Sequence, residues 1–120
     1  MAKAELNFGE LGGSNGTYKG EFTLDQTTVT VPLPFETKHL FVYRVGGSNN
    51  YQITISYDAN IETDKQVRHY ISAGTKGADY IGVNSTNSDA LQSVSSSQFV
   101  YKTSDLTNWG GTYEFIAIPM

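Results

Sequence analysis

The most suggestive group of metal-ligand side chains lies between residues 58 and 64. Oxygen-bearing side chains occupy every second position there: Asp58, Asn60, Glu62 and Asp64. This spacing resembles the first half of a calcium-binding loop, in which a hard cation takes several close oxygen ligands. The sixth position is threonine and the twelfth is histidine, where such loops use glycine and glutamate. A solvated acidic turn between two strands is the favoured interpretation, and a cation site is the alternative.

The residues that commonly carry catalysis form no constellation in this chain. His39 and His69 are far apart in the sequence, and no pattern of His, Asp or Glu accompanies them as a metal site would need. There is no cysteine, which excludes a thiol nucleophile and a zinc–thiolate site. The glycine pairs at 46–47 and 110–111 lack the Lys-Ser/Thr context of a phosphate-binding loop. We therefore expect no catalytic residue, no metal ion and no cofactor, and a protein that is not an enzyme.

One aromatic residue is a candidate for ligand binding. Trp109 is the only tryptophan, and it lies in the segment Asn108-Trp109-Gly110-Gly111. A sugar site needs an aromatic plane for the C–H face of a pyranose and neutral polar groups for its hydroxyls. Asn108 and Trp109 supply both, and we expect Tyr80 to contribute to the same site. The alternative is that Trp109 caps one end of the hydrophobic core.

Composition restricts the class of partner. The 120 residues suit one domain, the net charge is -4 and the basic residues are scattered. A phosphate backbone needs a cationic patch, so we expect no nucleic-acid partner. No stretch approaches the roughly 18 apolar residues of a membrane span, and we expect no membrane partner. The first residues contain no apolar signal-peptide core, which predicts synthesis in a cytoplasm without a classical export signal.

Hydrophobic periodicity predicts β-structure throughout. Apolar residues recur at every second position in segments 18–24, 29–33, 51–57, 66–72, 98–102 and 113–118, with shorter candidates at 79–83 and 91–94. The dense apolar segment 40–45 is typical of a central strand covered on both faces. Glycine, asparagine and serine separate these segments as turns would. The pattern predicts an all-β fold, an antiparallel β-sandwich of about seven or eight short strands over residues 17–120. Residues 1–16 are expected to form a flexible or packing N-terminal arm.

The phase of the alternation predicts the residues of the core. The side chains expected to face inward are Phe22, Val29, Val31, Leu40, Val42, Ile53, Ile55, Phe115 and Ala117.

Two segments carry a resemblance to a known class of protein. One runs from Gly20 through the valine-rich residues 28–31 and the Pro34-Phe35 pair to the apolar residues 40–43, and the other covers 98–101 and 113–118. Their order is similar to that of small β-sandwich modules of bacteriophage virions (tail, fibre or capsid), including the H-type-lectin-like pieces of tail and fibre proteins. The resemblance implies a homo-oligomer, with a trimer as the expected state, and sugar sites in loops near subunit boundaries.

Sequence and resemblance together favour one function over another. The leading hypothesis is a phage or prophage structural protein (a tail, baseplate or capsid component) that is located in the virion and contributes to attachment to the host surface. Its expected partners are further copies of itself, other virion proteins and a host cell-surface glycan. The alternative is a stand-alone carbohydrate- or protein-binding module.

Overall fold

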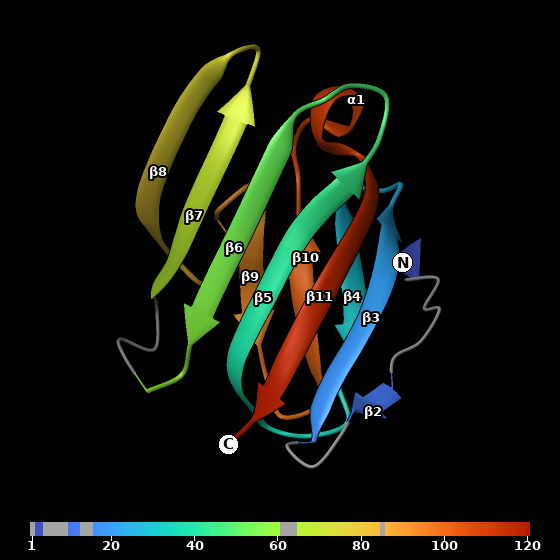
Figure 1. Ribbon diagram of the computed structural model, residues 1–120, viewed down its shortest axis with the longest axis vertical. Coiled ribbons are helices and arrows are strands. Elements are labelled where there is room, and N and C mark those ends of the chain that lie inside the picture. Colours follow the sequence, from blue (N-terminus) through green and yellow to red (C-terminus); the bar gives the residue numbers. More distant parts are fainter. Residues whose placement is uncertain (1, 4–9, 13–15, 61–64, 85) are drawn as a thin grey trace.

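Alternating apolar and polar residues build two β-sheets that face each other (Figure 1). The computed structural model describes residues 2–3, 10–12, 16–60, 65–84 and 86–120. The strands are β1 (Ala2–Lys3), β2 (Glu10–Gly12), β3 (Thr17–Leu24), β4 (Thr28–Pro32), β5 (Thr37–Gly46), β6 (Gln52–Asp58), β7 (Lys65–Ser72), β8 (Thr75–Gly82), β9 (Ala90–Val94), β10 (Gln98–Lys102) and β11 (Gly111–Pro119). One short helix, α1 (Leu106–Trp109), interrupts them within the described residues.

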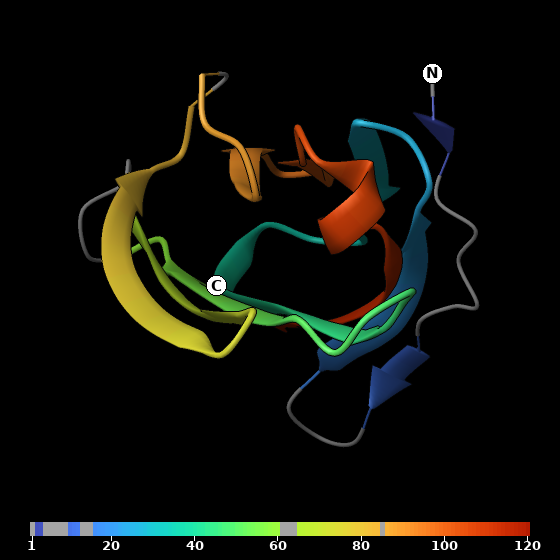
Figure 2. The same cartoon turned by 90° about the horizontal axis from the view of Figure 1, so that it is seen from above.

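The two sheets differ in width. The large sheet has the strand order β2-β3-β11-β5-β6-β7-β8, and the small sheet has the order β1-β4-β10-β9. All described pairings are antiparallel except the short parallel pair of β1 with β4. Figure 2 shows the large sheet curving around the small sheet and α1. The predicted antiparallel sandwich is confirmed, with nine strands of five residues or more in place of seven or eight.

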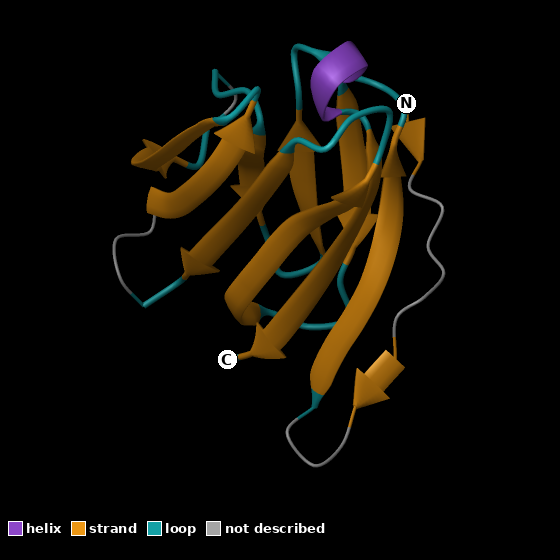
Figure 3. Cartoon of the chain, turned by 45° about the horizontal axis from the view of Figure 1, so that its top comes forward, coloured by secondary structure: helices purple, strands orange, loops and turns teal. Residues whose placement is uncertain are grey.

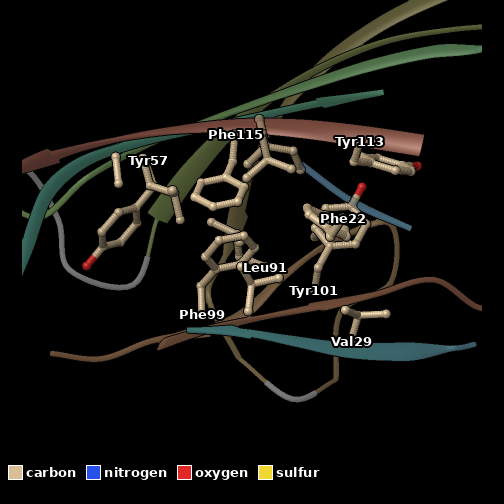
Figure 4. Close-up of a cluster of buried hydrophobic side chains, with 14 of the residues drawn as sticks. Phe22, Val29, Tyr57, Leu91, Phe99, Tyr101, Tyr113 and Phe115 are labelled. Atoms are coloured by element: carbon tan, nitrogen blue, oxygen red, sulfur yellow. The ribbon is translucent and has the colours of Figure 1, made fainter. Parts of the chain in front are cut away.

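Aromatic rings fill the space between the sheets (Figure 4). Phe22 lies at the centre, and its ring lies 5.3 Å from that of Tyr113 in the large sheet and 5.8 Å from that of Phe99 in the small sheet. Phe99 and Phe115 meet edge-to-face across the sheets at 5.3 Å, a favoured arrangement for aromatic pairs. Every one of the nine residues predicted to face inward is buried. The phases read from the sequence for β3, β4, β5, β6 and β11 are therefore correct.

The central strand β5 differs from its prediction. It lies in the middle of the large sheet, and its inner face is buried, with Leu40 and Val42 at 0 % exposure. On its outer face Val45 is 49 % exposed, because no second layer of the described chain covers that side. Apolar residues therefore occupy both faces of this strand, but a single chain buries one face only.

The described parts of the N-terminal arm pair with the sandwich itself. Strand β1 extends the small sheet beside β4, and β2 extends the large sheet beside β3. The described parts of the arm thereby add one short edge strand to each sheet through backbone hydrogen bonds.

The first prediction concerns the final strand. Phe115 is 1 % exposed and contacts three other rings. Phe115→Ala should lower the free energy of unfolding by about 3–5 kcal/mol, because it opens a cavity in the aromatic core. Chemical denaturation measures the change. The neighbouring Ile116→Ala, on the partly exposed opposite face, is the control and should cost less. Equal losses for the two variants would contradict the assigned strand phase.

The second prediction compares two buried tyrosines. Burial raises the pKa of both Tyr101 and Tyr113, so both hydroxyls stay protonated at neutral pH. The Tyr113 hydroxyl donates to the Trp109 carbonyl at 2.7 Å, whereas the fully buried Tyr101 hydroxyl interacts with the Tyr113 hydroxyl but makes no hydrogen bond of good geometry in the described part of the chain. Tyr113→Phe should therefore cost about 1 kcal/mol. Tyr101→Phe should leave stability unchanged or raise it, since it removes an unsatisfied polar group. Thermal and urea denaturation of the two variants measure the change in stability. A larger loss of stability for Tyr101→Phe than for Tyr113→Phe would show that the Tyr101 hydroxyl is hydrogen-bonded.

Candidate functional site

A pocket of about 220 Å³ lies at the α1 end of the sandwich. Its lining residues come from four segments of the chain: Ile53 of β6, Arg68, Tyr70 and Ser72 of β7, Asp89 of the loop before β9, and Trp109 of α1. Figure 3 shows α1 standing above the strands beside the loop that joins β5 to β6. The pocket therefore combines two aromatic walls with a cation, a carboxylate and a hydroxyl.

The first aromatic wall is Trp109, and the local sequence of α1 holds it in place. Asp105 caps the helix, because its carboxylate accepts hydrogen bonds from the Asn108 backbone N–H at 3.2 Å and from the Asn108 side-chain amide at 2.8 Å. The Trp109 ring lies 5.2 Å from the ring of Tyr51 and packs against the hydrophobic core while keeping part of its surface accessible. Trp109 therefore both packs against the hydrophobic core and lines the pocket, and its role in ligand binding stays a prediction.

A buried arginine fixes the loops around Trp109. Arg44 is 6 % exposed, and its Nε and Nη2 donate to the Gly110 carbonyl at 3.1 and 2.8 Å. Its Nη1 donates to the Tyr51 carbonyl at 2.7 Å and to Asn49 Oδ1 at 2.9 Å. A buried guanidinium is stable only when its donors are satisfied, so these bonds draw residues 49–51 and 110 together. Arg44 thereby positions both Tyr51 and Trp109.

The second aromatic wall is Tyr70, which depends on a glycine in the neighbouring strand. Gly77 pairs with Tyr70 in the β7–β8 ladder, and a Cβ atom at Gly77 would come within 2.3 Å of the tyrosine ring. The ring therefore occupies the space that a larger residue would fill. The Arg68 guanidinium lies 5.5 Å from the centre of the same ring, within reach of a cation–π contact.

The charged part of the pocket is a network around Arg68 and Asp89. Arg68 forms a two-pronged ion pair with Asp79, at 3.0 Å from Nε and 2.7 Å from Nη2, and its Nη1 donates to the carbonyls of Ser88 and Asp89. Asp89 has a φ of 56°, and its Oδ1 accepts a 2.6 Å hydrogen bond from the Thr103 hydroxyl. Burial raises the pKa of Asp89, and the hydrogen bond from Thr103 and the charge of Arg68 oppose that rise.

The structure separates the three residues predicted to bind a ligand. Trp109 lines the pocket, and Asn108 lies beside it with its side chain bound to Asp105. Tyr80 is 78 % exposed and pairs with Val67 in the ladder, whereas the adjacent pair Arg68 and Asp79 faces inward. Successive side chains alternate across a strand, so Tyr80 lies on the outer face of the large sheet and not beside Trp109.

Sequence reasoning missed most of the pocket. The alternation in segment 66–72 puts Arg68 and Tyr70 on one face of their strand, but nothing in that segment shows that this face is the inner one. Asp89 lies in a serine- and asparagine-rich segment that carries no pattern. The pattern of β7 pointed the other way, because its apolar residues Val67 and Ile71 lie on the face opposite Arg68 and Tyr70.

The acidic segment that begins at Asp58, the candidate cation site, makes only short-range contacts where it is described. Asp58 accepts a hydrogen bond from the Asn60 backbone N–H and lies 3.2 Å from His39, as a turn residue would, while Glu62 and Asp64 lie outside the described residues. Within the described ranges no three His, Cys, Asp or Glu side chains gather as a metal site requires.

No helix in the described part of the chain has the length and apolar character to span a membrane.

The segment from Gly12 to Gly16 has the Gly-x-Ser-x-Gly spacing of a hydrolase nucleophile elbow. An elbow joins a strand to a helix, whereas strand β3 follows this segment, and its serine, Ser14, lies outside the described residues.

Comparison with known proteins adds no relative. No family model matches the chain, and neither a curated protein nor a solved structure matches it.

The third prediction tests the Arg44 contacts through two adjacent glycines. A Cβ atom at Gly47 would lie 1.9 Å from Arg44 Nη2 and 2.6 Å from the Gly110 carbonyl, whereas a Cβ atom at Gly46 would meet nothing within 4 Å. Gly47→Ala should displace the guanidinium, cost about 1.5–3 kcal/mol and shift the fluorescence of Trp109. Gly46→Ala should leave both the free energy of unfolding and the emission wavelength near their original values. If both variants behave alike, Arg44 does not position Trp109.

Proposed function

We propose that this protein is a non-enzymatic binding module that holds a sugar in the pocket between Tyr70 and Trp109. The observation that carries the proposal is the combination of these two aromatic walls with Ser72, Arg68 and Asp89 in one cavity. Pyranose rings present C–H faces that pack on aromatic planes and hydroxyls that need fixed donors and acceptors. The pocket offers both kinds of contact.

The size and build of the pocket favour binding at modest affinity. A volume of about 220 Å³ is below the range of about 300–1,000 Å³ that encloses drug-sized ligands, so the pocket suits one or two sugar rings. Its walls are held before the ligand arrives, because Arg44 fixes the loop of Trp109 and Gly77 makes room for the ring of Tyr70. Such preorganisation lowers the entropic cost of binding.

A module with a weak site is most useful in many copies. The resemblance to phage virion modules supplies the setting: a structural protein of a phage or prophage particle that contributes to attachment to a host-surface glycan. Several weak sites on one particle act together, since each bound copy raises the effective concentration of the next. A stand-alone sugar-binding module is the alternative setting. Mass spectrometry of purified particles, which finds this chain in them only in the first case, separates the two.

The fourth prediction tests the sugar site with two tyrosines on opposite faces of the large sheet. Neutral oligosaccharide fragments of bacterial cell-wall polysaccharides are titrated while the fluorescence of Trp109 is followed. Tyr70→Leu should weaken binding about five- to tenfold, because a stacking plane worth about 1–1.5 kcal/mol is lost. Tyr80→Leu is the matched control, since Tyr80 is 78 % exposed on the outer face.

Two outcomes count against the proposal. One is that no fragment binds the unaltered protein. The other is that Tyr80→Leu abolishes binding and Tyr70→Leu does not, which would move the site to the outer face. Circular dichroism of both variants shows whether a loss of binding reflects a loss of fold.

The fifth prediction concerns self-association. The outer face of the large sheet exposes Val45 and Tyr80, and contact with a second chain would remove this surface from water. We expect a homo-oligomer, with a trimer as the proposed state. Light scattering at micromolar concentration should give a multiple of the 13.2 kDa chain mass. Tyr80→Glu should shift the assembly toward the monomer, and a monomer in the unaltered protein would contradict the proposal.

A further inference from the structure

Negative charge predominates around the pocket. Arg68 and Asp89 line it, Asp79 pairs with Arg68, and Asp105 adds to the rise in the pKa of Asp89. The Arg68 guanidinium thus interacts with the carboxyl groups of Asp79 and Asp89, and Asp105 adds a third negative charge near Asp89. An incoming anion would approach this negative excess inside a partly enclosed cavity, where charges are screened less than in water.

The guanidinium cannot offset this excess for a ligand. The fork of Arg68 formed by Nε and Nη2 is occupied by the two oxygens of Asp79, and Nη1 donates to the carbonyls of Ser88 and Asp89 at 2.9 and 3.1 Å. Arginine recognises carboxylate and phosphate groups through a free fork of two parallel N–H donors. The described hydrogen bonds leave Arg68 a single N–H of Nη2 and no free fork, so it is poorly suited to bind the carboxylate of an acidic sugar.

Asp89, in contrast, keeps an acceptor available. Its Oδ1 accepts the hydrogen bond from Thr103, which is the one hydrogen bond that this carboxylate takes from the described part of the chain. The side chain is half-buried, and burial is the largest cause of its raised pKa. Holding this charge in the cavity therefore costs free energy, and a cationic group of a ligand would reduce that cost.

We infer that the pocket selects its sugar by charge: it favours a hexosamine with a free, protonated amine over the neutral hexose and rejects the corresponding uronic acid, with Asp89 as the specificity-determining residue. This inference rests on the proposed sugar-binding function. The amine pairs with the carboxylate of Asp89, and the electron-rich faces of Tyr70 and Trp109 favour a cation beside them. The uronic acid meets repulsion from Asp89 with no free fork on Arg68 to compensate.

The experiment uses a panel of oligosaccharides in which only the charge differs. Gluco-, galacto- and manno-configured oligomers are each supplied as the neutral sugar, the 2-amino sugar and the uronic acid, and binding to the full chain is measured by calorimetry at pH 7. On the scaffold that binds, we expect the amino form to bind about tenfold more tightly than the neutral form. We expect the uronic acid to bind at least about tenfold more weakly than the neutral form.

The decisive variant is Asp89→Asn. The amide oxygen can still accept the hydrogen bond from Thr103, and asparagine tolerates the left-handed backbone at this position. The preference should disappear, so that the amino and neutral forms bind the variant within about threefold of each other, whatever the change in their common affinity. Asp58→Asn removes the same charge beside His39, outside the pocket, and should leave the preference intact.

The variant is expected to fold. Folding raises the pKa of Asp89, so the protonated carboxyl stabilises the folded state at low pH. This stabilisation is lost as the pH rises through the pKa of the folded state. Asp89→Asn should therefore unfold at an equal or higher temperature than the original protein at pH 7, and the difference should shrink as the pH falls. In the unaltered protein, raising the salt concentration should weaken binding of the amino form more than that of the neutral form.

Each result has one meaning. Equal affinity for the uronic acid and the neutral sugar, or an amine preference that survives Asp89→Asn, overturns the charge selection and leaves the sugar-binding function standing. Binding of no form on any scaffold overturns both.

Discussion

Polar side chains on the inner face of the large sheet must find hydrogen-bond partners, and this requirement fixes how α1 and the small sheet meet the large sheet. Arg44, Gln66 and Arg68 all point from the large sheet toward the interior. An unsatisfied group in that position would cost about 1–3 kcal/mol, and more for a charged one. Backbone groups of the surrounding segments supply the partners, so each polar residue draws another part of the chain into place.

Gln66 illustrates how this requirement joins the two sheets. Its amide donates to the carbonyls of Gly82 and Leu91, and its carbonyl oxygen accepts from the Leu91 N–H at 3.1 Å. Strand β9 of the small sheet is thereby tied to β7 of the large sheet by a side chain that is 1 % exposed. Arg68 lies two residues further along β7 on the same face, and its bonds to the carbonyls of Ser88 and Asp89 tie the loop before β9 to the large sheet. The aromatic core brings the sheets together, and these bonds set where the curved end of the large sheet meets the small one.

The pocket is a consequence of the same arrangement. Its walls are separated in the sequence by tens of residues, and each is fixed by a neighbour that does not itself line the cavity. Arg44 fixes the loop of Trp109, Gly77 admits the ring of Tyr70, and Thr103 orients Asp89. A cavity supported in this way keeps its shape without a ligand, which suits a module whose proposed task is to bind and not to transform its ligand.

The sequence by itself determined the strands and the core. Alternation with a period of two is a local property, and burying one phase of a strand such as β11 fixes Tyr113, Phe115 and Ala117 inside whatever the strand order is. It also marked Trp109 as a residue with two possible roles. Only the tertiary structure decided which residues stand around that ring. The inner face of β7 and the outer position of Tyr80 follow from the register between strands, and the place of Asp89 follows from a loop held by distant side chains. Such contacts depend on which segments meet in space, and no local pattern of residue types encodes that.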